Sequence, residues 1–394
     1  MAKVVVGLSG GVDSSVAAHI LKEQGHDVTA LFMINWHESK GVLQGNCSWD
    51  NDLTFAKLVA RKLDIPLQVV DLSEQYKKRV VDYMFAEYEK GRTPNPDVLC
   101  NREIKFDAFL DEALKLGADF VATGHYCRKE EITADNKKIY RLLAGKDNNK
   151  DQSYFLCQLN QKQLEKSLFP IGDLTKPEVR EIANKLKLAS ADKKDSQGIC
   201  FVGKVDLPVF LQQQLKAKEG EIIEIPIDFY KNAEVFDINS DDFLPNISKP
   251  IIYKNTDGIY TGKHNGAHFY TIGQRKGLNI GGKPLPSFVI STDIETNTIF
   301  VGQGKEHLGL FRKALLIKND EIHFIREDLK LKIGESKFFL VRHRYRQPLQ
   351  KAVLYMKQEG IYIVFEKAQR GITAGQFAAW YLNDELIGSG VINS

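Results

Sequence analysis

Two cysteines and one glycine- and serine-rich segment are the residues of this 394-residue sequence best suited to chemistry. Residues 9–15 read SGGVDSS, and the cysteines are Cys100 and Cys200. A glycine-rich turn that opens a helix holds phosphate, because its orphan N–H groups and the helix dipole favour an anion. A thiol near a helix N-terminus or near lysines ionises more readily, and the thiolate is the nucleophilic form. The predicted chemistry therefore combines phosphate binding with nucleophilic sulfur.

The apolar and polar pattern around residues 9–15 predicts a strand, a tight turn and a helix. An apolar run at residues 4–8 enters the segment, and an amphipathic run at 16–21 leaves it. Gly10 and Gly11 permit positive φ and a close approach of the backbone to an anion. The segment is neither a Walker A loop, which ends in Gly-Lys-Ser/Thr, nor a dinucleotide fingerprint. A plain tight turn is the alternative, and two glycines, an aspartate and paired serines make it the weaker one.

The first part of the chain has the rhythm of a parallel sheet covered on both faces. Apolar runs of strand length recur after the first strand, at residues 28–33, 67–70 and 120–123. Ligands of such sheets bind beyond the carboxyl ends of the strands. Met33 and Gly124 stand at two of these ends, so we expect both near a nucleotide, although core packing is the alternative for Met33.

Cys100 lies in a segment, residues 91–101, that reads GRTPNPDVLCN. Its two prolines favour an extended chain, and a helix is expected to follow from Ile104. The positive end of that helix dipole would favour a Cys100 thiolate, with Asp97 close enough to accept or donate a proton. Alternatively, residues 95–97 form a helix-entry turn and Cys100 is a small core residue. The residues alone leave both interpretations open.

Cys200 lies in a second loop, residues 195–201, that reads DSQGICF and follows Lys193 and Lys194. A cationic loop favours the thiolate and nucleophilic chemistry. The sequence holds five cysteines, an odd and scattered set with no zinc-ligand spacing. We therefore expect neither a structural disulfide framework nor a zinc site, and no other metal site is predicted.

Near the C-terminus, alternation in a predicted strand at residues 337–346 places Arg342, Arg344 and Arg346 on one face. Three guanidiniums in a row suit an RNA backbone, and Tyr345 is available for stacking or core packing. Solvated charge is an equally good interpretation. The polar residues 150–154, KDQSY, likewise suit either a ligand or a capped helix start.

Composition indicates an ordinary soluble protein, with 43% hydrophobic and 27% charged residues and a net charge of +3. No secretory or membrane-spanning pattern is present, so a cytoplasmic enzyme without membrane contacts is expected. The sequence pattern changes near residue 206. Evenly spaced β-runs after residue 288 predict an antiparallel β-barrel. We expect an α/β fold: a parallel-sheet domain (1–205), a small central domain (206–286) with an insertion near 225–254, and a C-terminal β-barrel (287–394).

Together these segments resemble the bacterial and mitochondrial tRNA-uridine 2-sulfurtransferases, members of the PP-loop ATP pyrophosphatase superfamily with its adenine nucleotide α-hydrolase-like domain. The matching segments run in order along the chain, at residues 9–15, 32–36 (FMINW), 91–101, 122–126 (ATGHY), 150–156 (KDQSYFL), 195–201, 273–277 (GQRKG) and 344–347 (RYRQ). Their co-occurrence is far more specific than any one of them. Only the stretch 225–254 looks longer than the usual central domain.

The resemblance implies roles for individual residues. ATP would be bound by Gly7, Leu8, Ser9, Gly10, Gly11, Val12, Asp13, Ser14, Met33 and Gly124. The flipped base would be held by Asn95, Pro96 and Asp97, and Asp97 is a possible acid or base. The anticodon stem-loop of tRNA would also contact His125, Lys150, Asp151, Gln152, Arg344, Tyr345 and Gln376. Cys200 would carry a persulfide from a sulfur-donor protein, and Cys100 would release the sulfur and end in a disulfide with Cys200.

The implied activity is ATP-dependent 2-thiolation of the wobble uridine, through an adenylate at the C2 oxygen. It needs transient Mg²⁺ and no permanent cofactor, and a monomer is expected. A PP-loop ligase or synthetase that activates a small-molecule carbonyl is the alternative, although it would need neither cysteine. A non-catalytic tRNA-binding protein is the third, and the intact Asp13 and Ser14 disfavour it. A 4-thiouridine synthase would usually carry an N-terminal RNA-binding module, whereas here the loop begins at residue 9.

Overall fold

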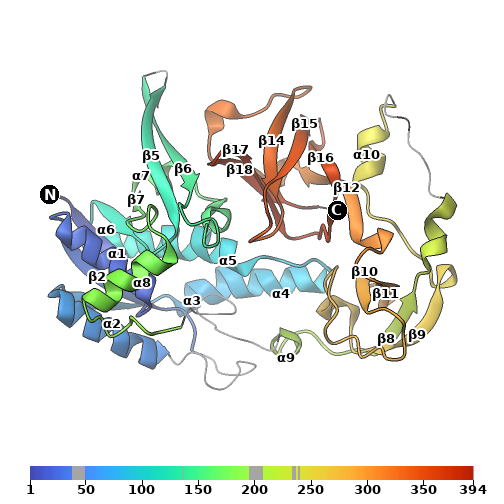
Figure 1. The fold of residues 1–394 in the computed structure, drawn as a ribbon, viewed down its shortest axis with the longest axis horizontal. Helices are drawn as coiled ribbons and strands as arrows, with labels where there is room; N and C mark the ends of the chain where they lie inside the picture. The colour runs from blue at the N-terminus through green and yellow to red at the C-terminus, as the bar shows by residue number, and fades with distance from the viewer. Residues whose placement is uncertain (38–48, 135, 195–206, 233–236, 238–239, 394) are drawn as a thin grey trace.

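The N-terminal part is a parallel sheet of five strands. The structure, a computed structural model, describes residues 1–37, 49–134, 136–194, 207–232, 237 and 240–393 (Figure 1). The strand order is β3 (Leu67–Asp71), β2 (Asp27–Ile34), β1 (Lys3–Gly7), β4 (Phe120–Ala122) and β7 (Ser167–Leu168). Every pair in this sheet is parallel. The predicted fold class is confirmed for this part of the chain.

Helices cover both faces of the sheet, so alternate side chains of β1 enter two different cores. Val4 and Val6 pack into a core with α1 (Val12–Glu23), α2 (Trp49–Leu63) and α8 (Lys176–Lys185). Val5 packs into the other core, with the helices between residues 73 and 115. These are α3 (Ser73–Tyr76), a π-helical turn (Lys77–Val81), α4 (Asp82–Glu89), α5 (Pro96–Leu99), a second π-helical stretch (Cys100–Ala108) and α6 (Phe109–Lys115).

The strand order reverses beside β1, and this positions the site. The chain runs from β1 outward to β2 and β3 and then returns to the opposite side of β1 as β4. The loops that leave β1 and β4 therefore diverge at the carboxyl edge of the sheet. A crevice at such a topological switch point is where open parallel sheets bind ligands.

The central part is a four-stranded sheet in the order β10 (Ser287–Asp293), β11 (Thr298–Gln303), β8 (Gly220–Glu224) and β9 (Ile259–His264). We expected residues 287–303 in the C-terminal barrel, but β11 pairs in parallel with β8. Sequential spacing alone does not reveal which sheet a strand joins, and we propose a boundary after Gln303. The expected insertion contains a short 3₁₀-helix (Ile227–Asn232) and α10 (Phe243–Ser248), and α9 (Leu207–Leu211) precedes β8.

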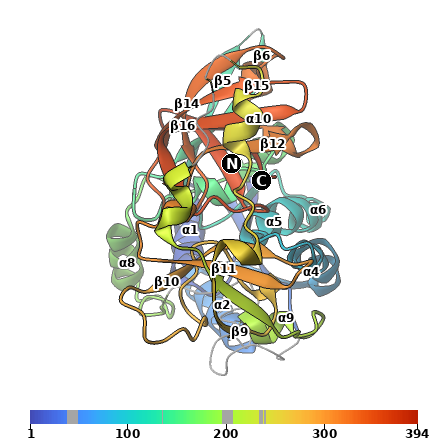
Figure 2. The ribbon, with the colours of Figure 1, turned by 90° about the vertical axis from the view of Figure 1, so that its right-hand side faces the viewer.

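The C-terminal part is one large antiparallel sheet, which lies above the central sheet in both ribbon views (Figures 1 and 2). Its order is β12 (Phe311–Lys318), β16 (Gly360–Arg370), β15 (Gln350–Met356), β14 (Ser336–Arg342), β17 (Phe377–Leu382), β18 (Glu385–Val391), β6 (Lys137–Ala144) and β5 (Cys127–Ala134), with β13 (Ile322–Phe324) beside β18. The last two strands of this order are a hairpin from the N-terminal part, which sequence analysis missed. Leu142 and Leu143 of β6 pair with Leu386 and Glu385 of β18, so the N-terminal and C-terminal parts of the chain share a sheet.

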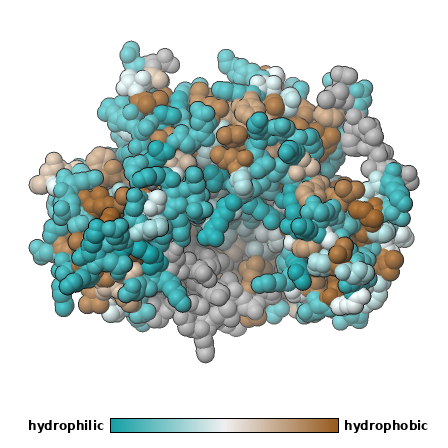
Figure 3. All heavy atoms as spheres, viewed as in Figure 1, coloured by the Kyte–Doolittle hydropathy of each residue, from teal (hydrophilic) through white to brown (hydrophobic). Residues whose placement is uncertain are grey.

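Short helices connect these elements, and the face seen in Figure 3 is mostly polar. They are α7 (Gln161–Glu165) and single turns at Ser153–Leu156, Asn255–Asp257, Ala267–Phe269, Leu308–Leu310, Asn319–Glu321 and Glu327–Leu329. On the face seen in Figure 3, hydrophilic side chains predominate and apolar ones are interspersed. No helix in the described ranges is long and apolar enough to cross a membrane.

Candidate functional site

The glycine- and serine-rich loop folds tightly onto the N-terminus of α1. Ser9 donates its backbone N–H to Ser14 Oγ at 3.3 Å, and the Ser14 and Ser15 hydroxyls donate to the carbonyl oxygen of Gly11 at 3.1 and 2.7 Å. Gly10 has a φ of +73°, and a Cβ there would lie 2.2 Å from the Asp52 carbonyl oxygen. Only glycine fits this position. The loop therefore brings its backbone to the positive end of α1, as an anion site requires.

Gly124 closes the same site from β4. A Cβ at Gly124 would lie 2.7 Å from the Asp13 carbonyl carbon and 2.7 Å from the Ser14 nitrogen. Met33, at the end of β2, is 8% exposed, and its Cε lies 3.7 Å from the position of a Cβ on Gly7. The predicted nucleotide-binding residues thus come together at the switch point. Any side chain at Gly124 would clash with the backbone of Asp13 and Ser14, so this position requires glycine.

Two lysines that sequence analysis did not single out for this site also reach the loop. Lys176, the first residue of α8, places Nζ 2.7 and 2.9 Å from the two carboxylate oxygens of Asp13. Lys193 donates from Nζ to the Gly10 carbonyl oxygen at 3.2 Å and to Asp52 Oδ1 at 2.5 Å. The loop carries no cation of its own, and these two supply positive charge from a distant segment. No local sequence signal identifies the Lys176 contact, because it depends on how α8 packs against α1.

Tyr126 completes the environment of the Asp13 carboxylate. Its hydroxyl donates to Asp13 Oδ1 at 2.7 Å, and the Lys176 ammonium lies 5.9 Å from the centre of its ring. The carboxylate is therefore held by a cation and a neutral donor at once. Such charge-assisted hydrogen bonds fix a side chain in one orientation.

The helix near Cys100 begins earlier than expected. α5 starts at Pro96, with Asn95 as its N-cap: the Asn95 side chain accepts from the Val98 N–H at 3.3 Å. Cys100 therefore lies after the first turn, fully buried, and not ahead of a helix starting at Ile104. Because the dipole effect is confined to the first turn, our argument for a thiolate from the helix terminus is wrong. Proline at the first helical position, next to an asparagine cap, was the signal for the earlier start.

Segment 93–95, just before this helix, makes hydrogen bonds to both the central and the C-terminal parts of the chain. Gln376 donates from Nε2 to the carbonyl oxygens of Thr93 at 2.9 Å and Pro94 at 3.2 Å. Its Oε1 accepts from Asn95 Nδ2 at 3.4 Å. The Thr93 hydroxyl lies 3.1 Å from that of Thr271 in the central part. Gln376 thus contacts this segment, which fixes the position of Asn95, Pro96 and Asp97.

Asp151 is buried, although we expected it to face tRNA. It is 6% exposed, and its Oδ1 accepts from the backbone N–H groups of Gly145 at 3.2 Å and Ser153 at 3.0 Å. Its Oδ2 accepts from Arg342 Nη2 at 2.8 Å, and Arg342 is itself 7% exposed. The ion pair joins the N-terminal part to β14. In this conformation Asp151 holds the domains together and does not face solvent.

The expected row of three arginines does not form. β14 ends at Arg342, and Arg346 has a φ of +64°, so alternation stops before the later residues. Arg344 turns inward and donates from Nη2 to the carbonyl oxygens of Gly371 at 2.7 Å and Ile272 at 3.1 Å. The Tyr345 ring lies 4.3 Å from that of Phe155. A turn that interrupts the strand explains the difference.

His125 and Gln152 also make internal contacts. His125 is 7% exposed, and its Nδ1 lies 2.8 Å from the Thr123 hydroxyl. Burial, with a smaller effect of the Lys105 charge, holds the pKa of His125 well below its usual value, so the ring is neutral. Gln152 accepts from the Tyr126 N–H at 3.0 Å. Of the predicted cluster at 150–152, Lys150 is half-buried.

The remaining cysteines divide into buried thiols and residues the structure does not describe. Burial raises the pKa of the Cys157 thiol to about 12 and that of Cys127 well above its usual value. Both are therefore poor nucleophiles. Cys200 and the predicted loop 195–201 lie outside the described residues, as does Cys47. Within the described ranges no group of three or more His, Cys, Asp or Glu side chains could hold a metal.

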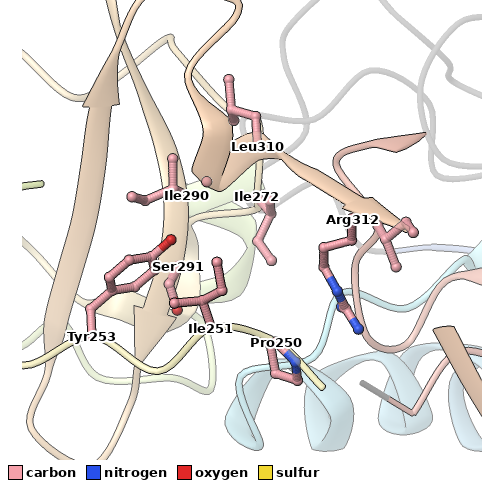
Figure 4. Close-up of a pocket in the computed structure, with 10 residues that line it drawn as sticks. Pro250, Ile251, Tyr253, Ile272, Ile290, Ser291, Leu310 and Arg312 are labelled. Atoms are coloured by element: carbon pink, nitrogen blue, oxygen red, sulfur yellow. The ribbon is translucent and has the colours of Figure 1, made fainter. Parts of the chain in front are cut away.

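A small pocket lies elsewhere, between the central and C-terminal parts (Figure 4). It is lined mainly by apolar side chains, among them Ile251, Ile272 and Ile290, with Arg312 on β12 beside Pro250. Burial lowers the pKa of Arg312 to about 10. None of the predicted site residues lines it, so it is separate from the switch-point site.

Comparison with known proteins gives matches along the whole chain. The family models that match are described as a tRNA methyl transferase HUP domain (residues 2–204), a tRNA methyl transferase PRC-barrel domain (241–303) and an aminomethyltransferase beta-barrel domain (314–392). The tRNA-specific 2-thiouridylase MnmA of Christiangramia forsetii is 59% identical, with 100% of each chain covered. That of Flavobacterium johnsoniae is 58% identical, again with 100% of each covered. Among solved structures, a 4-thiouridine synthetase–RNA complex with bound ATP aligns at 16% identity and a TM-score of 0.32, covering 54% of this chain and 50% of that one. It is too distant to inform function.

Proposed function

This chain belongs to the tRNA-specific 2-thiouridylase family, and from that premise we propose that it transfers sulfur to C2 of the wobble uridine of tRNA at the expense of ATP. It is an enzyme of tRNA modification, as its relatives are named. The observation that carries the ATP-dependent part is the meeting of the β1 loop, Gly124 and the N-terminus of α1 at the switch point of the sheet. That geometry suits a nucleotide phosphate.

The first proposed step activates the uridine. Its C2 oxygen attacks the α-phosphorus of ATP, forms an adenylate and releases pyrophosphate. Backbone groups of residues 7–14 bind the phosphates, and Met33 and Gly124 lie at the adenosine. Mg²⁺ bound with ATP would offset the phosphate charge, and Asp13 is a carboxylate in this loop that fits such an ion. Adenylation is needed because the C2 carbonyl is a poor electrophile with a poor leaving group.

The second proposed step transfers sulfur from a persulfide on Cys200, loaded by a sulfur-donor protein. The terminal sulfur attacks C2 and AMP leaves with the oxygen. The Cys100 thiolate then attacks Cys200 Sγ, which breaks the S–S bond, leaves sulfur on C2 and forms a Cys100–Cys200 disulfide. A cellular dithiol must reduce that disulfide before the next turnover. Cys100 is fully buried in this structure, so the proposal requires tRNA binding to expose its thiol.

Recognition of tRNA is proposed to centre on residues 95–97. Asn95, Pro96 and Asp97 would hold the flipped base, which a single-stranded anticodon loop releases from its stack at low cost. The hydrogen bonds that Gln376 donates to segment 93–95 support a positioning role for Gln376. Lys150 and Tyr345 stay proposed tRNA contacts, and Arg344 would have to release its internal hydrogen bonds to become one. For Asp151, His125 and Gln152, burial or internal hydrogen bonds favour an indirect role.

The test is a thiolation assay. Purified protein is incubated with unmodified tRNA, ATP, Mg²⁺ and a sulfide source, and the tRNA is run on an organomercury gel, which retards thiolated RNA. We expect a retarded band that needs ATP, maps to the wobble uridine and disappears in Cys200→Ser. Cys157→Ala is the matched control, since it removes a buried thiol outside the proposed chemistry, and it should retain the band.

The assay separates the competing functions. A band that persists in Cys200→Ser would contradict the proposed persulfide. No band despite release of AMP and pyrophosphate, also with a persulfide donor protein supplied, would point to a ligase that activates another carbonyl. Absence of both thiolation and tRNA-dependent ATP cleavage would favour a binding protein without catalysis.

A further inference from the structure

We propose that Lys176 binds the β- or γ-phosphate of ATP, and that it exchanges its ion pair with Asp13 for a phosphate oxygen when the nucleotide enters. This inference rests on the proposed function, because it adds a binding residue to the same ATP site.

The loop itself is poorly equipped for a triphosphate. Residues 9–15 contain no cation and include one carboxylate, Asp13. Backbone N–H groups and the α1 dipole supply only partial positive charge, equivalent to roughly half an elementary charge. A triphosphate therefore needs full charges from elsewhere in the fold. Lys176 is well placed, because its ammonium already lies 2.7 Å from the Asp13 side chain at the start of α1.

Lys176 occupies a position that helix stability alone would not select. It is the first residue of α8, after the Thr175 N-cap, where the dipole disfavours a cation. The rest of this helix start follows the stability rules: Thr175 and Glu178 form a capping box, and Pro177 stands in the first turn. The Lys176 side chain is also only 11% exposed, although lysine is rarely buried. A single residue that breaks local rules in an otherwise regular helix start is typical of functional sites.

The contacts of Lys193 indicate a different role. Its ammonium binds the Gly10 carbonyl oxygen and Asp52 and lies 4.4 Å from the centre of the Phe55 ring. It therefore ties the glycine turn to α2 and holds the loop in shape. Lys176 instead donates to both carboxylate oxygens of Asp13, and that carboxylate would turn to the divalent cation that accompanies ATP. The exchange keeps both charges paired before and after binding.

The experiment measures binding without turnover. Calorimetry gives the affinities of wild type and Lys176→Met for α,β-methylene-ATP, pyrophosphate and AMP, since the methylene analogue cannot be cleaved at that bond. A charge-assisted hydrogen bond contributes on the order of 1.5–3 kcal/mol, so we expect the analogue and pyrophosphate to bind about 10- to 150-fold more weakly. AMP, which lacks both outer phosphates, should change less than about threefold. Lys185→Met, an exposed lysine on the same helix, is the matched control and should bind all three as wild type does.

Each result bears on the proposal. Equal affinities in wild type and Lys176→Met, or an equal loss for AMP, would overturn it, the second because it shows a general structural role. If Lys176→Met does not fold, a crystal structure of the wild type with the analogue decides: Nζ within hydrogen-bond distance of an outer phosphate supports the proposal, and Nζ still on Asp13 overturns it. Failure of the wild type to bind the analogue at all would instead contradict the proposed ATP-dependent function.

Discussion

Replacing Asp151 by asparagine tests whether this residue holds the domains together or binds RNA. The substitution keeps the size of the side chain and one oxygen for the Gly145 and Ser153 N–H groups, but it removes the charge that pairs with Arg342 at 2.8 Å. Arg342 is 7% exposed, and its Nε has no partner among the described residues. Breaking such a buried pair typically costs about 3–5 kcal/mol, because the remaining charge stays desolvated. The Tyr381 ring, 4.8 Å from the guanidinium, stabilises Arg342 in part, so we expect about 3 kcal/mol.

Urea unfolding followed by tryptophan fluorescence measures the free energy of unfolding. Asp173→Asn is the matched control, because the Asp173 side chain is 84% exposed and lies 4.0 Å from its arginine partner, and it should change little. The double variant Asp151→Asn/Arg342→Met should recover part of the loss, since it removes the unpaired charge as well. A fall in tRNA affinity without a fall in stability would refute the reasoning and restore Asp151 as a direct RNA contact.

Two further predictions follow from other contacts. Gln376→Ala removes the hydrogen bonds to segment 93–95, so we expect thiolation to slow about tenfold with little change in unfolding free energy, and an unchanged rate would show that Gln376 does not position the segment. Burial, with the Arg344 and Arg312 charges, lowers the pKa of His343 to about 3. The unfolded state, with a pKa near 6.5, then binds the proton first, so His343 should cost about 2 kcal/mol of stability at pH 5 relative to pH 7.5. Unfolding curves of wild type and His343→Gln at both pH values would reveal this difference, and parallel losses would contradict it.

The geometry of the proposed nucleotide site was largely predictable because its parts are local in sequence. Residues 9–15 carry the turn, the helix start and the phosphate chemistry together, and the apolar runs identify the strands on either side. Gly124 could be placed because the carboxyl ends of parallel strands share an edge. The site was therefore specified by patterns that span a few residues each, and the structure assembles them as expected.

Features that depend on contacts between distant segments escaped prediction. Lys176 reaches Asp13 only because α8 packs on α1, and no sequence pattern near either residue predicts this ion pair. Asp151 and Arg342 look like surface charges in the sequence, because a buried ion pair does not change the hydrophobic periodicity around it. Cys100 is a different case: the Asn95-Pro96 cap was visible, but the prolines were interpreted as an extended segment, which moved the expected helix start. Cys200 lies outside the described ranges, and its role as the persulfide carrier stays a proposal.

The hairpin of β5 and β6 has a consequence for how the protein is made. Its partner strand β18 begins at Glu385, whereas β6 ends at Ala144. The hairpin is therefore synthesised long before the strand that covers its edge. Until then β6 exposes unpaired backbone groups, which invite pairing with other chains. We therefore expect a nascent or truncated chain ending near residue 205 to be prone to aggregation. The edge of this hairpin is covered only after nearly the whole chain has been synthesised.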